Sequence, residues 1–120
     1  MKMQLDTMKC GPCMKGAIPL TGERLRVYAE YLPNWKVVRG HHIERTFAFD
    51  DFKSALAFTN VIGALSEEEG HHPDITLSWG SVGVNLHTHK IDGLTENDFI
   101  LAAKFEKAYG RSGEADTKES

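Results

Sequence analysis

The sequence contains no long apolar run. None of its hydrophobic stretches approaches the roughly 20 consecutive apolar residues that a membrane-spanning helix requires. The first ten residues, MKMQLDTMKC, have no apolar core of the kind found in secretory signals, and they are not rich in arginine and serine as transit peptides are. We therefore expect a cytoplasmic protein that does not contact a membrane.

An excess of basic residues is also missing. The chain has 14 Lys and Arg against 17 Asp and Glu, which gives a formal net charge of −3. This balance argues against nucleic acid as a partner, because nucleic-acid-binding domains usually carry a basic patch. At 120 residues the chain is long enough for one domain with one hydrophobic core.

The hydrophobic pattern begins only after residue 18. Residues 1–18 have no periodicity and are expected to form a flexible N-terminal extension. Residues 19–110 carry the predicted domain, and the polar residues 111–120 are expected to form a disordered tail.

Cysteine is scarce, and both cysteines lie in the extension as a CxxC motif, Cys10 and Cys13. The letters CGPC match a thioredoxin-type active site, but no strand precedes them and no βαβ unit contains them, so a redox role is disfavoured. Two interpretations remain. The pair is either an exposed dithiol or half of a zinc site that takes further ligands from histidines or from another subunit.

Three helices and two hairpins are predicted within the domain. The helices are indicated by apolar spacings of three and four residues and by end signals: Thr21 as an N-cap, Asp50 or Asp51 as the next, Gly70 as a stop, and Thr95 as the last N-cap. The hairpins cover residues 35–49 and 75–89. In the first, a turn centred on Gly40 pairs Val37 with Ile43.

The resulting order is α-β-β-α-β-β-α, so the fold class is α+β. We expect a four-stranded antiparallel sheet with the helices packed on one face. Such a sheet has two open edges, which proteins usually cover or pair, and a homodimer or homotetramer is therefore expected.

The second hairpin places two distant histidines together. A two-residue loop of Gly80 and Ser81 would pair Leu77 with Val84 and put Trp79 on the apolar face, in the core. Extended outward, this register places His72 opposite His89.

Six histidines occur in the chain, including two adjacent pairs. The pair His71 and His72 is expected to converge with His89, and Glu67 lies about one helical turn before it. Imidazoles near neutral pH suit general acid–base chemistry, although exposed histidines at strand ends are often inert. The other pair, at residues 41–42, lies in a hairpin loop with no expected partner, and we predict no chemistry there.

This pattern resembles the pterin-4a-carbinolamine dehydratase family. The resemblance covers about Leu20 to Tyr109 and includes the stretches LTENDFILAAK and ERTFAFDDFKSALAF. The spaced residues that carry it are Glu67, His71, His72, Pro73, Trp79, His89 and Asp98.

The resemblance implies the dehydration of a 4a-hydroxytetrahydropterin to quinonoid dihydropterin, in tetrahydrobiopterin recycling, with no required cofactor or metal. It implies that His71 and His89 are the acid–base residues, with neither role assigned, and that His72 positions the substrate. Glu67 would orient the histidine pair. The family's substrate contacts correspond to Thr88 through Lys90 in this chain. The substrate would come from an aromatic amino-acid hydroxylase.

Some assignments stay open. Asp98 matches the family pattern, but capping of the last helix is a sufficient structural reason for it. His87 lies outside the pattern and is expected to be a solvated or interface histidine. Two other functions remain: a non-enzymatic role in binding a protein partner, since animal members of the family act as dimerization cofactors, and a small zinc-binding protein that uses histidines and cysteines.

Overall fold

The computed structural model describes residues 4–11 and 19–119, with the backbone alone for residues 111–119. The order of helices and strands is the predicted one, preceded by a 3₁₀ turn. The elements are η1 (Leu5–Thr7), α1 (Gly22–Glu30), β1 (Lys36–Val38), β2 (His42–Ala48), α2 (Phe52–Glu69), β3 (Asp74–Ser78), β4 (Ser81–Leu86), η2 (His89–Ile91) and α3 (Glu96–Glu119).

Local signals set the helix ends. Asp51, and not Asp50, is the N-cap of α2, because its carboxylate accepts the backbone N–H of Ser54 at 2.8 Å. The helix stops at Gly70, which adopts the left-handed conformation with φ of 66°. Glycine takes this conformation without the steric penalty of a Cβ atom, and this explains the sharp end just before the histidine pair.

The four strands form one antiparallel sheet in the order β1-β2-β4-β3. The predicted pairing of Val37 with Ile43 is confirmed. Arg39 and Gly40 both have positive φ, as hairpin turns that match the strand twist require. The open edges of the sheet are β1 and β3.

The predicted register of the second hairpin is wrong by two residues. Val84 pairs with Ile75, where Leu77 was expected, and Leu77 pairs with Val82. The loop consists of Trp79 and Gly80. The carbonyl oxygen of Gly80 accepts a hydrogen bond from the backbone N–H of Phe49 at 2.8 Å. A shift of two preserves the alternation of side chains, so both registers pair apolar residues with apolar residues.

The shift also overturns the assignment of Trp79 to the core. The side chain lies at the apex of the β3–β4 loop and is 68% exposed. The neighbouring Gly80 comes close to the preceding segment, because a Cβ atom there would lie 3.2 Å from the Phe49 carbonyl oxygen. The loop therefore packs through its backbone and directs the indole outward.

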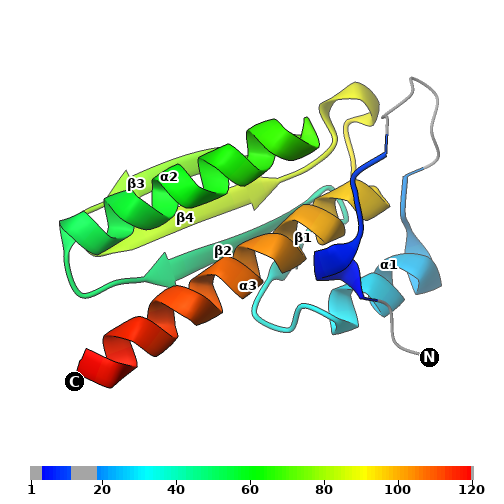
Figure 1. The fold of residues 1–120 in the computed structure, drawn as a ribbon. Coiled ribbons are helices and arrows are strands. Elements are labelled where there is room, and N and C mark those ends of the chain that lie inside the picture. Colours follow the sequence, from blue (N-terminus) through cyan, green and yellow to red (C-terminus); the bar gives the residue numbers. More distant parts are fainter. Residues whose placement is uncertain (1–3, 12–18, 120) are drawn as a thin grey trace.

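The helices cover one face of the sheet, as predicted (Figure 1). In this view α2 runs along β3 and β4, α3 crosses β2, and the two helices lie side by side. The core fills the space between the layers, and its largest fully buried side chains are Phe47, Phe58, Phe99, Phe105, Ile43, Ile62, Leu86, Leu94, Ile100 and Leu101. None of the helices among the described residues is long and apolar enough to cross a membrane.

The described residues before α1 and after residue 110 contact or continue the domain. Leu5 is buried in the core, and η1 packs on α3. The backbone of residues 111–119 continues α3, where a disordered tail was expected. The boundaries at residues 18 and 110 stay predictions.

We predict that Phe47→Ala lowers the free energy of unfolding by about 3–5 kcal/mol, the usual cost of truncating a buried phenylalanine. Phe47 is fully buried and packs against the rings of Trp35, Phe58 and Tyr109. Urea unfolding at one fixed protein concentration measures the change. Phe52→Ala is the matched control, since Phe52 is 44% exposed, and its cost is expected to stay below about 1 kcal/mol. Equal losses in the two variants would contradict the assigned core.

Candidate functional site

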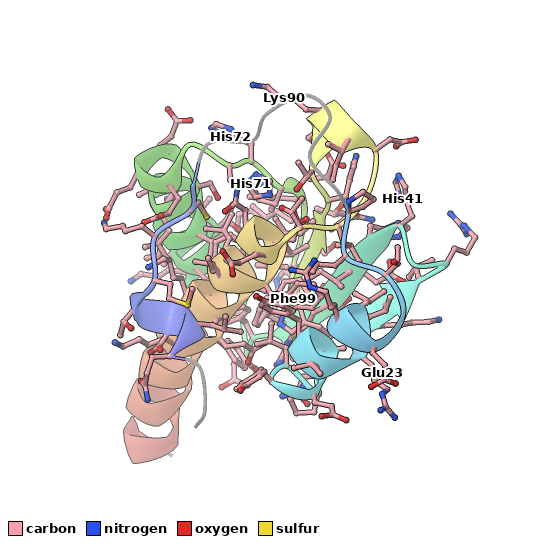
Figure 2. The ribbon with its side chains drawn as sticks, turned by 90° about the vertical axis from the view of Figure 1, so that its right-hand side faces the viewer. Glu23, His41, His71, His72, Lys90 and Phe99 are labelled. Atoms are coloured by element: carbon pink, nitrogen blue, oxygen red, sulfur yellow. The ribbon has the colours of Figure 1, made fainter. Side chains whose placement is uncertain are left out.

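A pocket of about 420 Å³ lies where the end of α2, the end of β4 and the start of α3 meet. Figure 2 shows His71, His72 and Lys90 at this end of the molecule. Half of the residues that line the pocket were predicted for the site, namely His71, His72, Thr88, His89 and Lys90. The other half was not predicted and consists of Cys10, Gly11, Glu69, Gly70 and Asn97.

The convergence of His71, His72 and His89 arises differently from the sequence argument. β3 begins only at Asp74, after Pro73, and in the observed register position 72 would lie opposite position 87. His89 instead belongs to η2, which follows β4. The three imidazoles meet because the αL stop at Gly70 and the turn after β4 reach the same end of the sheet.

His71 is held by a buried carboxylate. Its Nε2 lies 2.6 Å from Oδ1 of Asp98, and the His71 side chain is 8% exposed whereas Asp98 is fully buried. A carboxylate on one ring nitrogen fixes both the orientation and the tautomer of an imidazole. With Nε2–H donating to Asp98, the neutral ring carries its lone pair on Nδ1.

Asp98 also caps α3. Its Oδ2 accepts the backbone N–H of Thr95 and the hydroxyl of Thr88, both at 2.9 Å. The carboxylate therefore makes the capping contact and the histidine contact at once, one through each oxygen. Thr88, fully buried, is placed at the pocket by this bond.

His72 makes a different contact. Its Nε2 hydrogen-bonds Oε2 of Glu67, and both side chains are exposed. Glu67 reaches His72 and does not line the pocket. An exposed pair of this kind contributes little to stability, so the contact mainly restricts the orientation of the ring.

His89 lies on a tight turn between β4 and α3. An isolated bridge between Thr88 and Gly93 closes the turn, and the ring of His89 packs against that of His87 in a tilted arrangement, with a centroid distance of 4.1 Å. His87 is half-buried, and burial, together with the neighbouring His89 and His41, lowers its pKa. The sequence predicted a solvated or interface histidine at this position; the half-buried ring is not fully solvated, and an interface role stays a prediction.

The N-terminal segment forms part of the pocket wall. The backbone N–H of Cys10 donates to Oε1 of Glu69 at 2.8 Å, and Gly11 exchanges two hydrogen bonds with the side chain of Asn97. Cys13 lies outside the described residues. The CxxC motif indicated that this segment was unusual, but no local pattern connected it to residues far along the chain.

The prediction that the other histidine pair has no partner is wrong. Nε2 of His41 lies 2.7 Å from Oδ1 of Asp92, and the rings of His41 and His87 are 4.8 Å apart. Burial and the neighbouring His41 lower the pKa of His42. Asp92 and His87 come from the segment after β4, which approaches the first hairpin only in the folded chain.

A larger hollow of about 610 Å³ lies on the uncovered face of the sheet. Its lining includes Glu44, Thr46, Thr76 and Asn85, with no imidazole among its residues. The smaller pocket is the better candidate site, because it gathers several titratable groups around one concave space. Imidazoles that differ in burial and in partners can supply an acid and a base within one pocket.

Comparison with protein families gives a match over most of the chain. The family model described as Pterin 4 alpha carbinolamine dehydratase matches residues 18–108. A relative in Alkaliphilus metalliredigens is 55% identical over 104 residues, which cover 86% of this chain and 94% of the relative. A relative in Rubrobacter xylanophilus is 49% identical over 104 residues, covering 87% and 97%. Both are provisionally named pterin-4-alpha-carbinolamine dehydratases.

Solved structures are also similar. A protein from Brucella melitensis, described as a transcriptional coactivator/pterin dehydratase, superposes with a TM-score of 0.73 at 32% identity, covering 78% of this chain and all of that one. A pterin dehydratase-like protein, described as a RuBisCO assembly factor in the α-carboxysome, has a TM-score of 0.56 at 28% identity, covering 64% and 90%.

We predict that Glu69 stabilises the N-terminal segment in a pH-dependent way. Burial raises the pKa of Glu69, but the Cys10 N–H and the ammonium groups of Lys104 and Lys9 lower it by more, so the net shift is downward from 4.5. The contribution is therefore complete above pH 4.5 and is lost as the pH falls through the folded pKa below that value. Thermal unfolding of wild type and Glu69→Gln is expected to differ at pH 7 and to converge in acid.

Glu68→Gln is the control for this comparison. Glu68 is the adjacent carboxylate, is well exposed and contacts only the flexible end of Lys9 among the contacts described for it. Its substitution is expected to leave the pH dependence of the melting temperature unchanged. A constant difference between wild type and Glu69→Gln from pH 7 to pH 3 would contradict the assigned role of Glu69.

Proposed function

Because the chain belongs to the pterin 4 alpha carbinolamine dehydratase family, a family of hydro-lyases, we propose that it dehydrates a 4a-hydroxytetrahydropterin. The reaction would proceed by histidine acid–base catalysis in the pocket of about 420 Å³. The observation that carries the proposal is the buried His71–Asp98 pair, which opens into the same pocket as His89. The pocket of about 420 Å³ is within the range of small-molecule sites.

The reaction removes one molecule of water. The C4a–O bond of the carbinolamine breaks, the proton on N5 leaves, and a C4a=N5 double bond forms. The departing hydroxyl needs a proton and N5 needs a base, so the chemistry requires one acid and one base but no change of oxidation state. No metal or redox cofactor is required for either proton transfer.

The contacts of His71 favour it as the base. Asp98 accepts Nε2–H, so Nδ1 of the neutral ring can accept the N5 proton, and the carboxylate stabilises the imidazolium that results. His89, which lines the same pocket, then protonates the leaving hydroxyl. The sequence left these two roles unassigned, and the difference in partners supports this assignment.

The remaining residues position the substrate. His72, held by Glu67, and the Thr88–Lys90 segment supply polar groups around the pterin. Cys10, Gly11 and Asn97 add a further wall that the family resemblance did not indicate. The substrate would be supplied by an aromatic amino-acid hydroxylase, in tetrahydrobiopterin recycling. We also propose that the chain acts as a homo-oligomer in the cytoplasm.

A second candidate is a non-enzymatic role in binding a protein partner. It is favoured by the two solved neighbours, one described as a coactivator and the other as an assembly factor. This candidate would be favoured if a variant without dehydratase activity restored the phenotype of cells that lack the protein. If the protein acts as an enzyme, the same variant is expected to fail to restore that phenotype.

We predict that His71→Ala and His89→Ala each lower kcat/KM for carbinolamine dehydration by about 10²–10⁴, the usual contribution of a positioned acid or base. Stopped-flow absorbance of a freshly generated 4a-carbinolamine measures the rate. His42→Ala removes a histidine outside the pocket and serves as the control, with activity close to wild type. Wild-type dehydration by the double variant lacking both His71 and His89 would refute the proposed function.

We further predict that Asp98 acts on the reaction through His71. Asp98→Asn is expected to lower kcat by about 10–100-fold, as the loss of outer partners of reactive groups commonly does. In a His71→Ala background the same substitution is expected to cost little further, because the group it orients is gone. Additive losses would show that Asp98 supports only the fold, and far-UV circular dichroism checks that α3 remains formed.

A further inference from the structure

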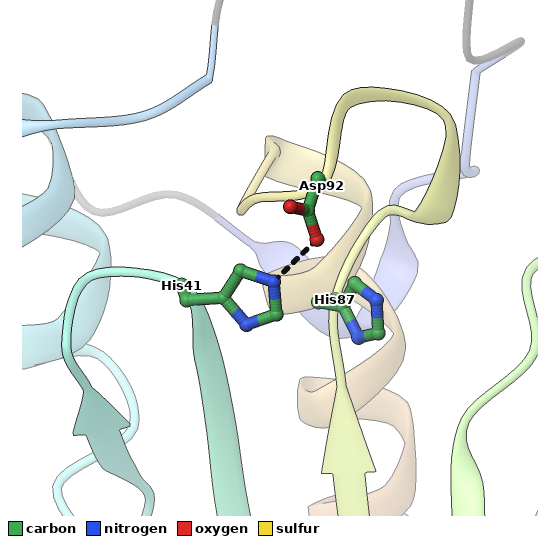
Figure 3. Close-up of side chains that lie close together, drawn as sticks. All are labelled: His41, His87 and Asp92. Atoms are coloured by element: carbon green, nitrogen blue, oxygen red, sulfur yellow. Dashed lines mark hydrogen bonds and ion pairs between the residues drawn. The ribbon is translucent and has the colours of Figure 1, made fainter.

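Three side chains lie together beside the pocket and have no part in the proposed dehydration. In the β2–β4 pairing Ile43 faces Leu86, so the residues just beyond both strands remain adjacent, which brings the first hairpin against His87. The turn closed by the Thr88–Gly93 bridge then carries Asp92 back to the same place. Figure 3 shows His41, His87 and Asp92 facing one another.

The three side chains have the spacing of a metal site. Each offers one ligand atom, and these atoms all lie within 4.8 Å of one another. In its usual tetrahedral sites zinc holds imidazole nitrogen and carboxylate oxygen at about 2.0–2.2 Å, which puts two ligand atoms of one ion about 3.4 Å apart. The three side chains are exposed or half-buried, and they would have to rotate to bring their ligand atoms this close.

The donor set selects a class of metal. Two imidazoles and one carboxylate suit borderline divalent ions such as Zn²⁺, and an open fourth position takes water. Neutral imidazoles and ionised carboxylates are the forms that bind metal.

A surface ion pair does not account for the whole arrangement. The His41–Asp92 contact alone would contribute little, because the Asp92 side chain is 85% exposed. Such a pair has no need of His87, whose ring lies 4.8 Å from that of His41. Asp92 also has a φ of 52°, a conformation that is uncommon outside glycine, although aspartate tolerates it better than most residues.

We propose that His41, His87 and Asp92 form a binding site for one divalent transition-metal ion, best suited to Zn²⁺. The site is distinct from the pocket and takes no cysteine ligand, so it also differs from a zinc site built on Cys10 and Cys13. Binding joins the first hairpin to the turn after β4, two parts of the chain that no covalent link holds together.

The test is a titration of metal-free, full-length protein with Zn²⁺, followed by calorimetry, and with Co²⁺, followed by visible absorption. One Zn²⁺ per chain is expected for wild type and equally for the Cys10→Ser, Cys13→Ser variant. Even the loss of an outer partner of a metal ligand commonly weakens metal binding by about 10–100-fold. His87→Gln and Asp92→Asn each remove a proposed ligand itself, so each is expected to weaken Zn²⁺ binding at least about tenfold. The Co²⁺ spectrum should show d–d bands without a thiolate charge-transfer band.

The control is the other exposed histidine–carboxylate pair, His72 and Glu67. It has the same chemistry but only two members, so His72→Gln is expected to leave the affinity for Zn²⁺ unchanged. Asp92→Gly removes the ligand and the unusual aspartate conformation together, and it should weaken binding as Asp92→Asn does. Absence of stoichiometric Zn²⁺ in wild type, unchanged affinity in folded ligand variants, or loss of binding in the cysteine variant would each overturn the proposal.

Discussion

The buried carboxylate of Asp98 is the constraint on which the functional end of the molecule depends. It is fully buried, and it accepts hydrogen bonds from the Thr95 backbone, the Thr88 hydroxyl and the His71 ring. An ionised carboxylate buried without such donors would be strongly destabilised. These donors belong to the start of α3, the end of β4 and the segment after α2, so satisfying one charge fixes three parts of the chain relative to one another.

This arrangement joins structural and chemical requirements in one side chain. The sequence offered capping of the last helix and participation in the site as alternatives for Asp98. In the structure one oxygen contacts the histidine and the other makes the capping bond, so the two readings do not compete. The capping hydrogen bond fixes the position of the carboxylate, and a carboxylate in a fixed position restricts the orientation of the His71 ring.

Four imidazoles form a continuous row from the first hairpin to the pocket. The centroid distances are 5.3 Å between His42 and His41, 4.8 Å between His41 and His87, and 4.1 Å between His87 and His89. The proposed metal site lies at the middle of this row, and His89 lies at its pocket end. The turn of residues 88–93 belongs to both places, so the ordering of one is physically connected to the ordering of the other.

The sequence by itself determined the order of the elements, the end of α2 at Gly70, its start at Asp50 or Asp51, and the pairing of Val37 with Ile43, because each rests on contacts between residues close in the chain. The spacing of His71, His72, His89 and Asp98 also identified the family, and half of the pocket lining was predicted from the sequence. Local patterns could not determine the β3–β4 register, because registers that differ by two residues keep the same side chains on the same face.

Only the tertiary structure decided the rest. It exposed Trp79, placed Cys10 and Gly11 on the pocket wall, and brought His41 to Asp92, a residue 51 positions away. Hydrophobic periodicity reports which face of an element is buried, but it carries no information about which distant polar groups that burial brings together. Those long-range contacts follow from the way in which the helices pack on the sheet.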